Sequence, residues 1–515
     1  MVKKLIPAAV AALLLASAPS FAADKLHWIT LGDAAYKQLQ KMAPQAIAKH
    51  SVMADNGAQS LADGEKAHLV QVSEKQMFAL SHAVHHELKR CGGFMFHPTE
   101  AAGRAALAGR NNLLAVKASR PSYAITQQST VNAVLPNMQA SNIAQTINDL
   151  SNFVNRYYQT QGGVDASAWL MNKWKTIAGS RTDISVAQFT HASWKQKSVI
   201  VTINGTDNPN EIVVLGGHLD SINTSGTTET TRAPGADDDA SGIATMTEVL
   251  RALVANGYKP RRTIKMMAYA AEEVGLRGSQ EIANSFASSN ANVVGVMQLD
   301  MTNYKGGAND IYLFTDYTDV QQTAFVKNLI TTYLPGVTVG SDKCGYACSD
   351  HASWFNKGYF TTMPFESPMN SSNPYIHTVN DTFANSRNQA DHALKFAKMA
   401  AAFAIELGSQ GAAPPSGDRT ETFSGSLARG ASKSFGPFKL AANGTFKAST
   451  TGSGDIDLYV KKGGVPTTTS YSCKSDGSTS TETCSTTSTT NTDVYVLVYG
   501  YTAGNYNLTV TYKAQ

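Results

Sequence analysis

The stretch Val213-Val-Leu-Gly-Gly-His-Leu-Asp220 decides the fold, because it leads an apolar strand directly into a polar pair. A short apolar run of this kind is typical of a strand buried on both faces of a parallel sheet. Downstream, apolar residues recur at helical spacing from Ile243 to Val254, and Gly257 stands where a glycine commonly ends a helix. This succession predicts one unit of an α/β fold.

Further β-branched runs continue the pattern along the chain, at 198–203, 212–215, 263–269 and 293–299. They alternate with helical periodicities, so we predict an α/β domain over 122–409, with a mostly parallel mixed sheet flanked by helices. A Gly-, Pro- and Ser-rich linker is expected at 410–417. Beyond it, Thr- and Ser-rich alternating runs predict a small β-sandwich over 418–515.

The N-terminus has the layout of a secretory signal peptide over residues 1–22, with two early lysines, an apolar run and the small-x-small site Ser20-Phe21-Ala22. The apolar run is far shorter than the ~20 residues of a spanning helix, so no membrane anchor is expected. These features predict a protein secreted to the extracellular space. The helix-favouring residues 23–121 are interpreted as a helical N-terminal propeptide that ends near Pro121.

Charge is unevenly distributed: residues 1–121 carry 14 basic and 8 acidic side chains, and the remaining 394 carry 29 and 31. Without the first segment the chain has no positive surplus, so nucleic acid is not expected as a partner. Seven of the 12 histidines lie in that segment. His82, His85 and His86 are either a metal cluster on a helix or, as we favour, a packed or solvated helical face.

The five cysteines suit an oxidising compartment. Three residues separate Cys344 from Cys348, and ten separate Cys473 from Cys484, so either pair can close a small loop. A zinc site is the alternative, although neither spacing matches the C-x2-C pair of such sites. The Ser/Thr tract 467–492 is predicted to be a long surface loop closed by its two cysteines.

Imidazole and carboxylate groups follow the predicted strands and precede the predicted helix. They are His218 and Asp220, the run Asp237-Asp238-Asp239, Glu272 and Glu273, Asp300 and, in a later loop, His377. In open α/β sheets ligands bind beyond the carboxyl ends of the strands, so these groups are expected to converge. Imidazole with carboxylate suits zinc, with manganese or cobalt as substitutes.

The set provides ligands for two divalent ions and leaves one carboxylate free for another role. Asp220, two residues after His218, is placed to fix the orientation of the imidazole. Three consecutive aspartates repel one another, and a helix N-terminus relieves only ~0.3–1 kcal/mol of this for each. Glu272 and Glu273 point in different directions, so one can bind metal while the other handles protons. Two ions ~3.5–4 Å apart polarise a carbonyl and activate a bridging water, which predicts two-metal hydrolysis.

The motifs GGHLDS, APGADDDASG, AYAAEEVGLRGS, LDMTNY, CGYACSDHASW and NPYIHT closely resemble the secreted bacterial leucyl aminopeptidases of the M28 zinc peptidase family, Vibrio/Aeromonas type. The resemblance covers about residues 123–409 and implies a zinc-exopeptidase-like fold. It implies a monomer that removes N-terminal residues from peptides and proteins and prefers large hydrophobic ones such as leucine. The tail is similar to a bacterial pre-peptidase C-terminal (PPC) domain, through DIDLYV and YNLTV.

The resemblance also assigns roles within a site that holds two zinc ions. It gives His218 and Glu273 to one zinc, His377 and Asp300 to the other, and Asp238 to both. Glu272 takes the proton of the bridging water and passes it to the leaving amine, and Asp220 orients His218.

The remaining implied roles concern the substrate pocket and the propeptide. Cys344 and Cys348 form a disulfide, and Tyr346 between them helps to stabilise the oxyanion. Met301 and Phe365 shape the hydrophobic pocket, which discriminates by preference rather than strictly. The propeptide restrains activity and assists folding.

Three alternatives stay open at this stage. A single-zinc glutaminyl cyclase of the same fold would bind one zinc and release no amino acid from peptide amides. A non-catalytic binding protein on the same scaffold would lack ligand residues, and none is missing here. The C-terminal sandwich is a third candidate for the functional part, as a domain that binds insoluble substrate.

Overall fold

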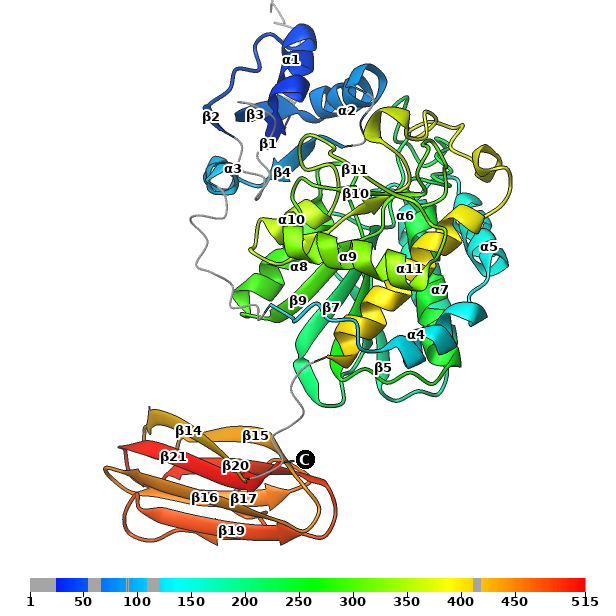
Figure 1. The fold of residues 1–515 in the computed structure, drawn as a ribbon. Coiled ribbons are helices and arrows are strands. Elements are labelled where there is room, and N and C mark those ends of the chain that lie inside the picture. Colours follow the sequence, from blue (N-terminus) through cyan, green and yellow to red (C-terminus); the bar gives the residue numbers. More distant parts are fainter. Residues whose placement is uncertain are drawn as a thin grey trace, which may run out of the picture. The chain divides into compact units, whose positions relative to one another are not determined.

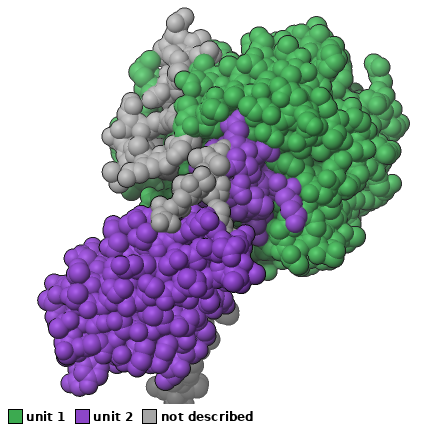
Figure 2. All heavy atoms as spheres, turned by 60° about the horizontal axis from the view of Figure 1, so that its bottom comes forward, with its two compact units in different colours: residues 1–203, 213–258, 265–406 green, residues 204–212, 259–264, 407–515 purple. Residues whose placement is uncertain are grey.

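The computed structural model describes residues 25–53, 66–88, 90, 92–108, 120–410 and 418–514. The predicted signal peptide, Cys91 and nearly all of the predicted linker lie outside these ranges. The chain divides into two compact units, drawn in different colours in Figure 2: residues 1–203, 213–258 and 265–406 form unit 1, and residues 204–212, 259–264 and 407–515 form unit 2. Within the described residues, no helix combines the length and the apolar character that crossing a bilayer requires.

A six-stranded sheet carries the α/β part, with the strand order β12-β9-β7-β8-β6-β5. Its strands are β5 (Ile184–Phe189), β6 (Ser198–Ile203), β7 (Asn208–His218), β8 (Arg262–Tyr269), β9 (Asn292–Gln298) and β12 (Thr361–Thr362). β12 pairs with β9 in parallel and β5 pairs with β6 antiparallel, so the sheet is mixed, as predicted. A smaller sheet, β11-β10-β13, joins β10 (Ile311–Phe314), β11 (Val339–Asp342) and β13 (Pro364–Phe365).

Helices surround the sheet, as Figure 1 shows. They are α4 (Gln128–Val134), α5 (Ala140–Ser151), α6 (Gln161–Ala178), α7 (Ala240–Ala255), α8 (Arg277–Ser288), α9 (Val320–Tyr333), α10 (His351–Phe355) and α11 (Asp391–Ser409), with 3-10 turns η3 (Leu135–Asn137), η4 (Met369–Ser371) and η5 (Phe383–Ser386). The predicted helix is α7, which Asp239 caps by accepting the Gly242 N–H at 2.9 Å. Gly257 follows it with a φ of +62°, the left-handed conformation that favours glycine there.

The N-terminal segment, residues 25–108, combines a sheet with helices, so the prediction of a helical propeptide was incomplete. Its elements are β1 (Leu26–Gly32), α1 (Asp33–Met42), β2 (His50–Met53), β3 (Lys66–Ser73), α2 (Glu74–Leu88), β4 (Phe94–His97) and α3 (Glu100–Leu107). The strands form an antiparallel sheet in the order β2-β3-β1-β4. Strands such as β3 gain stability from pairing with strands distant in the sequence, which local helix propensity does not report.

Unit 2 contains the predicted β-sandwich as two antiparallel sheets, β14-β21-β16-β19 and β15-β20-β17-β18. The strands are β14 (Asp418–Leu427), β15 (Ser432–Leu440), β16 (Gly444–Gly452), β17 (Ile456–Lys462), β18 (Cys473–Ser475), β19 (Glu482–Ser488), β20 (Thr492–Gly500) and β21 (Gly504–Lys513). The tract 467–492 is not one long loop, because β18 and β19 lie within it and Cys473–Cys484 joins these two strands. Threonine fits a pleated, half-buried surface well, so a Thr-rich run can form a strand.

Candidate active site

The predicted site residues come from the ends of neighbouring strands. His218 ends β7, Asp300 follows β9, and the pair Glu272 and Glu273 follows β8. The Leu219 N–H donates to the Tyr269 carbonyl and the Leu299 N–H to the Gly216 carbonyl, which holds the three strand ends side by side. Asp238 precedes α7, and His377 lies in the loop between η4 and η5. Convergence at strand ends, predicted from the sequence, is present in the structure.

Asp238 lies between the two histidines, and all five candidate ligands are buried. The His218 Nε2 is 2.9 Å from Asp238 Oδ1, and the His377 Nε2 is 3.1 Å from Asp238 Oδ2. Asp300 Oδ1 lies 3.6 Å from His218 Nε2, and Glu273 Oε2 lies 2.9 Å from His377 Nε2. Each oxygen of the Asp238 carboxylate therefore faces one imidazole, and each imidazole has one further carboxylate beside it.

These contacts exchange the pairing that the resemblance implied. His218 has Asp300 as its second carboxylate neighbour, and His377 has Glu273. The reason is local: Asp300, two positions past β9, meets His218 at the end of the adjacent strand β7, whereas the separate loop carries His377 over the end of β8. The ligand atoms of His218, Asp238 and Glu273 also lie within 4.8 Å of one another, so the two halves are contiguous.

The chemistry of these residues fits a pair of divalent cations. Among the described residues, the buried Glu273 Oε1 and Asp300 Oδ1 have no hydrogen-bond partner. A buried carboxylate oxygen without a donor is costly, and a metal ion is one of the few partners that satisfies it. Two imidazoles and three carboxylates are the donor set that zinc takes in proteins.

The electrostatics of the site indicate an excess of buried negative charge. Burial raises the pKa of the Glu272 carboxyl well above its usual range, with nearby Asp350 and Asp300 adding to the effect and His218 opposing it. Burial would lower the pKa of His218, but Asp300 and Glu272 raise it well above its ordinary value. The pKa of the carboxyl and the pKa of the imidazole are both raised, because buried negative charge lacks a balancing positive charge. Such a site favours the binding of cations.

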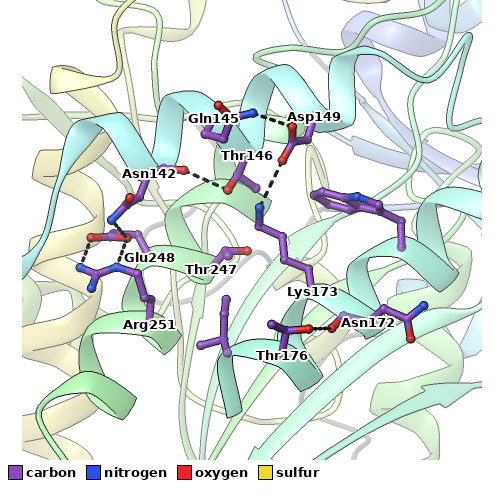
Figure 3. A pocket seen from close by; sticks show the side chains of 12 residues that line it. Asn142, Gln145, Thr146, Asp149, Asn172, Lys173, Thr176, Thr247, Glu248 and Arg251 are labelled. Atoms are coloured by element: carbon purple, nitrogen blue, oxygen red, sulfur yellow. Dashed lines mark hydrogen bonds and ion pairs between the residues drawn. The ribbon is translucent and has the colours of Figure 1, made fainter. Parts of the chain in front are cut away.

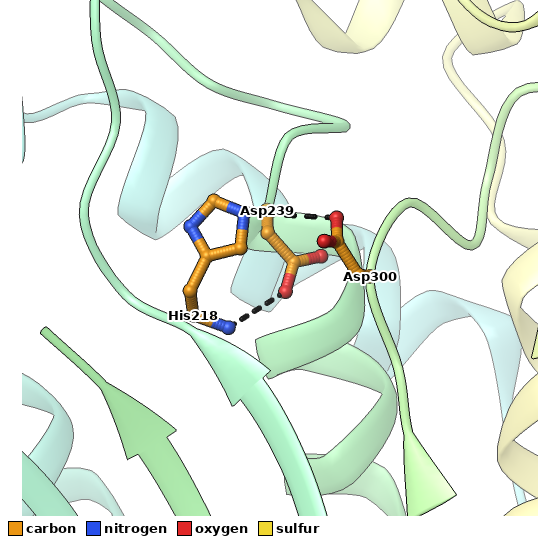
Figure 4. A group of neighbouring side chains, drawn as sticks. All are labelled: His218, Asp239 and Asp300. Carbon is orange, nitrogen blue, oxygen red and sulfur yellow. Dashed lines mark hydrogen bonds and ion pairs between the residues drawn. The ribbon is translucent and has the colours of Figure 1, made fainter. Parts of the chain in front are cut away.

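Asp239 was predicted only as a member of the aspartate run, and its contacts give it a distinct position. Its carboxylate accepts three backbone N–H groups, from His218 at 3.0 Å, Gly242 at 2.9 Å and Met301 at 3.1 Å. Figure 4 shows Asp239 between His218 and Asp300. It therefore ties together the three segments that carry candidate ligands. An aspartate immediately before a helix is an N-cap pattern, so the sequence held a signal for it.

Asp220 contacts both His218 and the two glutamates, and its role in orienting His218 stays a prediction. Its carboxylate accepts the backbone N–H groups of Glu272 at 3.0 Å and Glu273 at 3.2 Å. The His218 Nδ1 lies 3.1 Å from the backbone carbonyl of Asp220 and 3.7 Å from its carboxylate, an ion-pair distance. Asp220 therefore contacts His218 through its main chain and its carboxylate, and the same carboxylate fixes the turn that presents the two glutamates.

Sequence reasoning missed two residues that support Asp238. Asp381 accepts the Asp238 N–H at 3.1 Å. The fully buried Arg156 donates to the carbonyls of Leu219, Pro234 and Gly235 at 2.8, 2.5 and 2.9 Å. Both anchor the segment before α7, and neither lies in a pattern that could have signalled this.

The predicted pocket residues Met301 and Phe365 share one apolar cluster with the disulfide Cys344–Cys348 and with Ile376, next to His377. Both side chains are fully buried. Tyr346, between the two cysteines, belongs to a different cluster, which draws on both the N-terminal segment and the rest of the chain.

A separate hollow between α5, α6 and α7, seen in Figure 3, contains none of the predicted site residues. Its charged groups are paired, Lys173 with Asp149 at 3.3 Å and Arg251 with Glu248 at 2.6 Å. We therefore place the candidate site at the strand ends.

Known proteins match two parts of this chain. Residues 198–404 match Peptidase family M28, and residues 437–500 match the bacterial pre-peptidase C-terminal domain. The probable aminopeptidase YDR415C of Saccharomyces cerevisiae is 31% identical over 67% of this chain and 93% of its own length. The chain belongs to peptidase family M28. Leucine aminopeptidase 1 of Emericella nidulans is 39% identical over 54% of this M28 chain and 73% of its own.

A solved structure supports the M28 fold as well. The LapA aminopeptidase of Legionella pneumophila is 30% identical, with a TM-score of 0.61, over 75% of this chain and all of that one. The predicted family, the mixed α/β fold, the PPC domain and the assignment as a hydrolase of this family are thereby confirmed. The domain boundaries at 121, 409 and 417 stay predictions.

Proposed function

We propose that this M28 peptidase is a secreted dinuclear zinc aminopeptidase that removes large hydrophobic residues, leucine above all, from the N-termini of peptides and proteins. The observation that carries the proposal is Asp238 between two imidazoles, at 2.9 and 3.1 Å, with one further carboxylate beside each. Relatives named as leucine aminopeptidases support the substrate preference.

In the proposed site, His218 and Asp300 would hold one zinc, His377 and Glu273 the other, and Asp238 both. When bound, such a pair supplies Lewis-acid polarisation of the scissile carbonyl and a lowered pKa for water. Glu272 carries no assigned ligand role, so it would accept the proton of the attacking water and return it to the leaving amine. The Asp220 carboxylate holds the Glu272 backbone and thereby orients this base.

The other proposed roles concern substrate and regulation. The apolar cluster of Met301 and Phe365 would receive the N-terminal side chain of the substrate. Tyr346 would donate its hydroxyl to the oxyanion. The N-terminal segment would act as an intramolecular inhibitor and folding aid, and the mature enzyme would work as a monomer after export by the signal peptide.

The test is metal analysis beside a panel of aminoacyl amides, with and without chelator, on the chain freed of its N-terminal segment. We expect two equivalents of zinc, fastest cleavage of leucine amide, loss of activity on chelation and recovery when zinc is returned. Cleavage that survives complete metal removal, or one zinc at full activity, would refute the proposal.

A further inference from the structure

The loop that carries His377 is fastened at both ends to the aspartates that precede α7. At the start of the loop, the fully buried Asn373 donates through Nδ2 to Asp237 Oδ2 at 3.0 Å. At its end, Asp381 Oδ2 accepts the Asp238 N–H at 3.1 Å. Between these two points the His377 Nε2 lies 3.1 Å from Asp238 Oδ2. Two candidate ligands therefore face each other within a frame of hydrogen bonds that other side chains make.

The Asn373 side chain uses both its amide nitrogen and its oxygen in this frame. A carboxamide has two N–H donors, and Nδ2 also donates to Asp381 Oδ1 at 3.2 Å. The Asn373 Oδ1 accepts the Tyr375 N–H at 3.0 Å, inside the loop. The partner Asp237 is held from its other side, because Asp237 Oδ1 accepts the Asn303 N–H at 3.2 Å. Asn373 therefore closes the loop and joins it to an anchored carboxylate.

The His377 ring lacks the contact that usually orients a metal-binding histidine. Such a histidine normally donates its second ring nitrogen to a carboxylate, a carbonyl or water. His218 has this contact, because its Nδ1 lies 3.1 Å from the Asp220 carbonyl. The His377 Nδ1 is buried and has no hydrogen-bond partner among the described residues. Its ring packs beside that of His85 of α2, at 5.4 Å between centroids. The position of His377 therefore depends more on its backbone than that of His218 does.

That backbone is in an unfavourable conformation. The φ of His377 is +58°, in the left-handed region that disfavours residues with a side chain. Such a conformation persists only where the surrounding contacts hold it. The His377 carbonyl accepts the Thr224 N–H at 3.0 Å, and the bonds at the ends of the loop provide further restraint. Loss of Asn373 would release one of these ends.

We propose that Asn373 is a positioning residue for His377: by joining the loop to Asp237, it sets this imidazole against the shared ligand Asp238. The inference rests on the proposed function, in which two zinc ions share Asp238. It makes the two zinc positions unequal. Without Asn373, the zinc held by His377 binds more weakly. The zinc held by His218 keeps its affinity, because that ligand ends strand β7 of the sheet.

The test is zinc binding by the full chain with Asn373→Leu, which is similar in size and has no hydrogen-bonding group. The metal-free protein is titrated with zinc against a chromogenic chelator, and bound zinc is counted by elemental analysis. We expect two equivalents in the parent. In Asn373→Leu, we expect one equivalent of parental affinity and one that binds about 10- to 100-fold more weakly, the usual effect of changing a group that orients a metal ligand.

A double-mutant cycle asks whether Asn373 acts through His377. The variant His377→Ala should retain the zinc held by His218. If Asn373 acts through His377, adding Asn373→Leu to His377→Ala leaves the affinity for that remaining zinc unchanged. A general loosening of the site would weaken the remaining zinc as well.

Gln322→Leu is the matched control. Gln322 is also a fully buried carboxamide, and its Nε2 donates to the Val296 carbonyl at 2.8 Å, within β9 and away from the candidate ligands. In urea unfolding of the metal-free chain, both leucine variants should be less stable than the parent, because each leaves a buried polar group without its partner. Only Asn373→Leu should change zinc affinity. Asn373→Ala, which adds no bulk, gives the same comparison if the leucine variant does not fold.

The outcomes separate the two proposals. A parent chain that binds one zinc or none refutes the dinuclear site of the proposed function, and the inference falls with it. If the parent binds two, three results overturn the positioning role of Asn373 alone. They are parental affinity at both positions in the Asn373 variants, equal weakening of both positions, or a further loss of affinity in the His377→Ala background.

Discussion

Replacing Asp239 by asparagine removes one of three hydrogen bonds that hold the candidate metal centre together. Asp239 Oδ1 accepts the N–H groups of Gly242 and Met301, and Oδ2 accepts that of His218. Asparagine caps helices about as well as aspartate, so a carbonyl oxygen in the Oδ1 position keeps the first two bonds. The amide NH2 then faces the His218 N–H, donor against donor.

The expected cost follows from that one bond. A buried N–H left without an acceptor costs about 1–3 kcal/mol, so the metal-free Asn variant should lose ~2 kcal/mol of unfolding free energy. Displacing the end of β7 also moves His218. Changes to groups that orient metal ligands typically weaken metal affinity 10- to 100-fold. Asp239→Ala loses all three bonds and should cost at least twice as much stability.

Urea unfolding of the metal-free chain measures the first effect, and zinc competition with a chromogenic chelator measures the second. Asp319→Asn is the control, because Asp319 caps α9 through the Gln322 N–H and pairs with Arg120, away from the candidate ligands. It should alter stability and leave zinc affinity unchanged. Equal costs for Asp239→Asn and Asp239→Ala, or an Asn variant with parental zinc affinity, would refute the reasoning.

Three further predictions use other residues. Glu272→Ala should retain zinc and lose at least ~100-fold in kcat, since general base catalysis contributes about 10²–10⁴-fold. If the variant keeps its activity, Glu272 is not the general base. Asp238→Ala should lower zinc content, measured by elemental analysis, and two bound equivalents would contradict a shared ligand. Burial lowers the pKa of His97 from its ordinary value near 6.5 to about 4. As the pH falls, His97 therefore takes up its proton at a higher pH in the unfolded chain than in the folded chain. The stability present above pH 6.5 should drop by up to ~3 kcal/mol toward pH 4, and His97→Asn should flatten this pH dependence.

The strands and helices of the α/β part follow closely from local pattern. The run 198–203 coincides with β6, and the helical periodicity from Ile243 falls within α7. The first signal is strong because a strand buried on both faces needs continuous apolar residues. The second is strong because the apolar face of a helix repeats every three to four residues. The N-terminal segment was harder to predict, because its strands depend on partners far along the chain.

The sequence also named the candidate ligands, whereas it did not indicate which of them are closest neighbours. Motif order identifies His218, Asp300 and Glu273 as candidates, but which carboxylate neighbours which imidazole depends on strand order and on the path of a distant loop. Likewise, the spacing of Asp220 from His218 gives no sign that its carboxylate also binds the backbone of the glutamates.

The amino-acid order alone determined the family, the sandwich at the C-terminus and the residue types gathered for metal chemistry, because apolar periodicity and closely spaced donors are properties of neighbouring residues. Only the tertiary structure decided that Asp239 joins three segments, that Arg156 supports the turn before α7, and that Tyr346 lies within a core shared with the N-terminal segment. Each of these depends on contacts between residues far apart in the chain, which packing of the whole molecule brings together and no local pattern records.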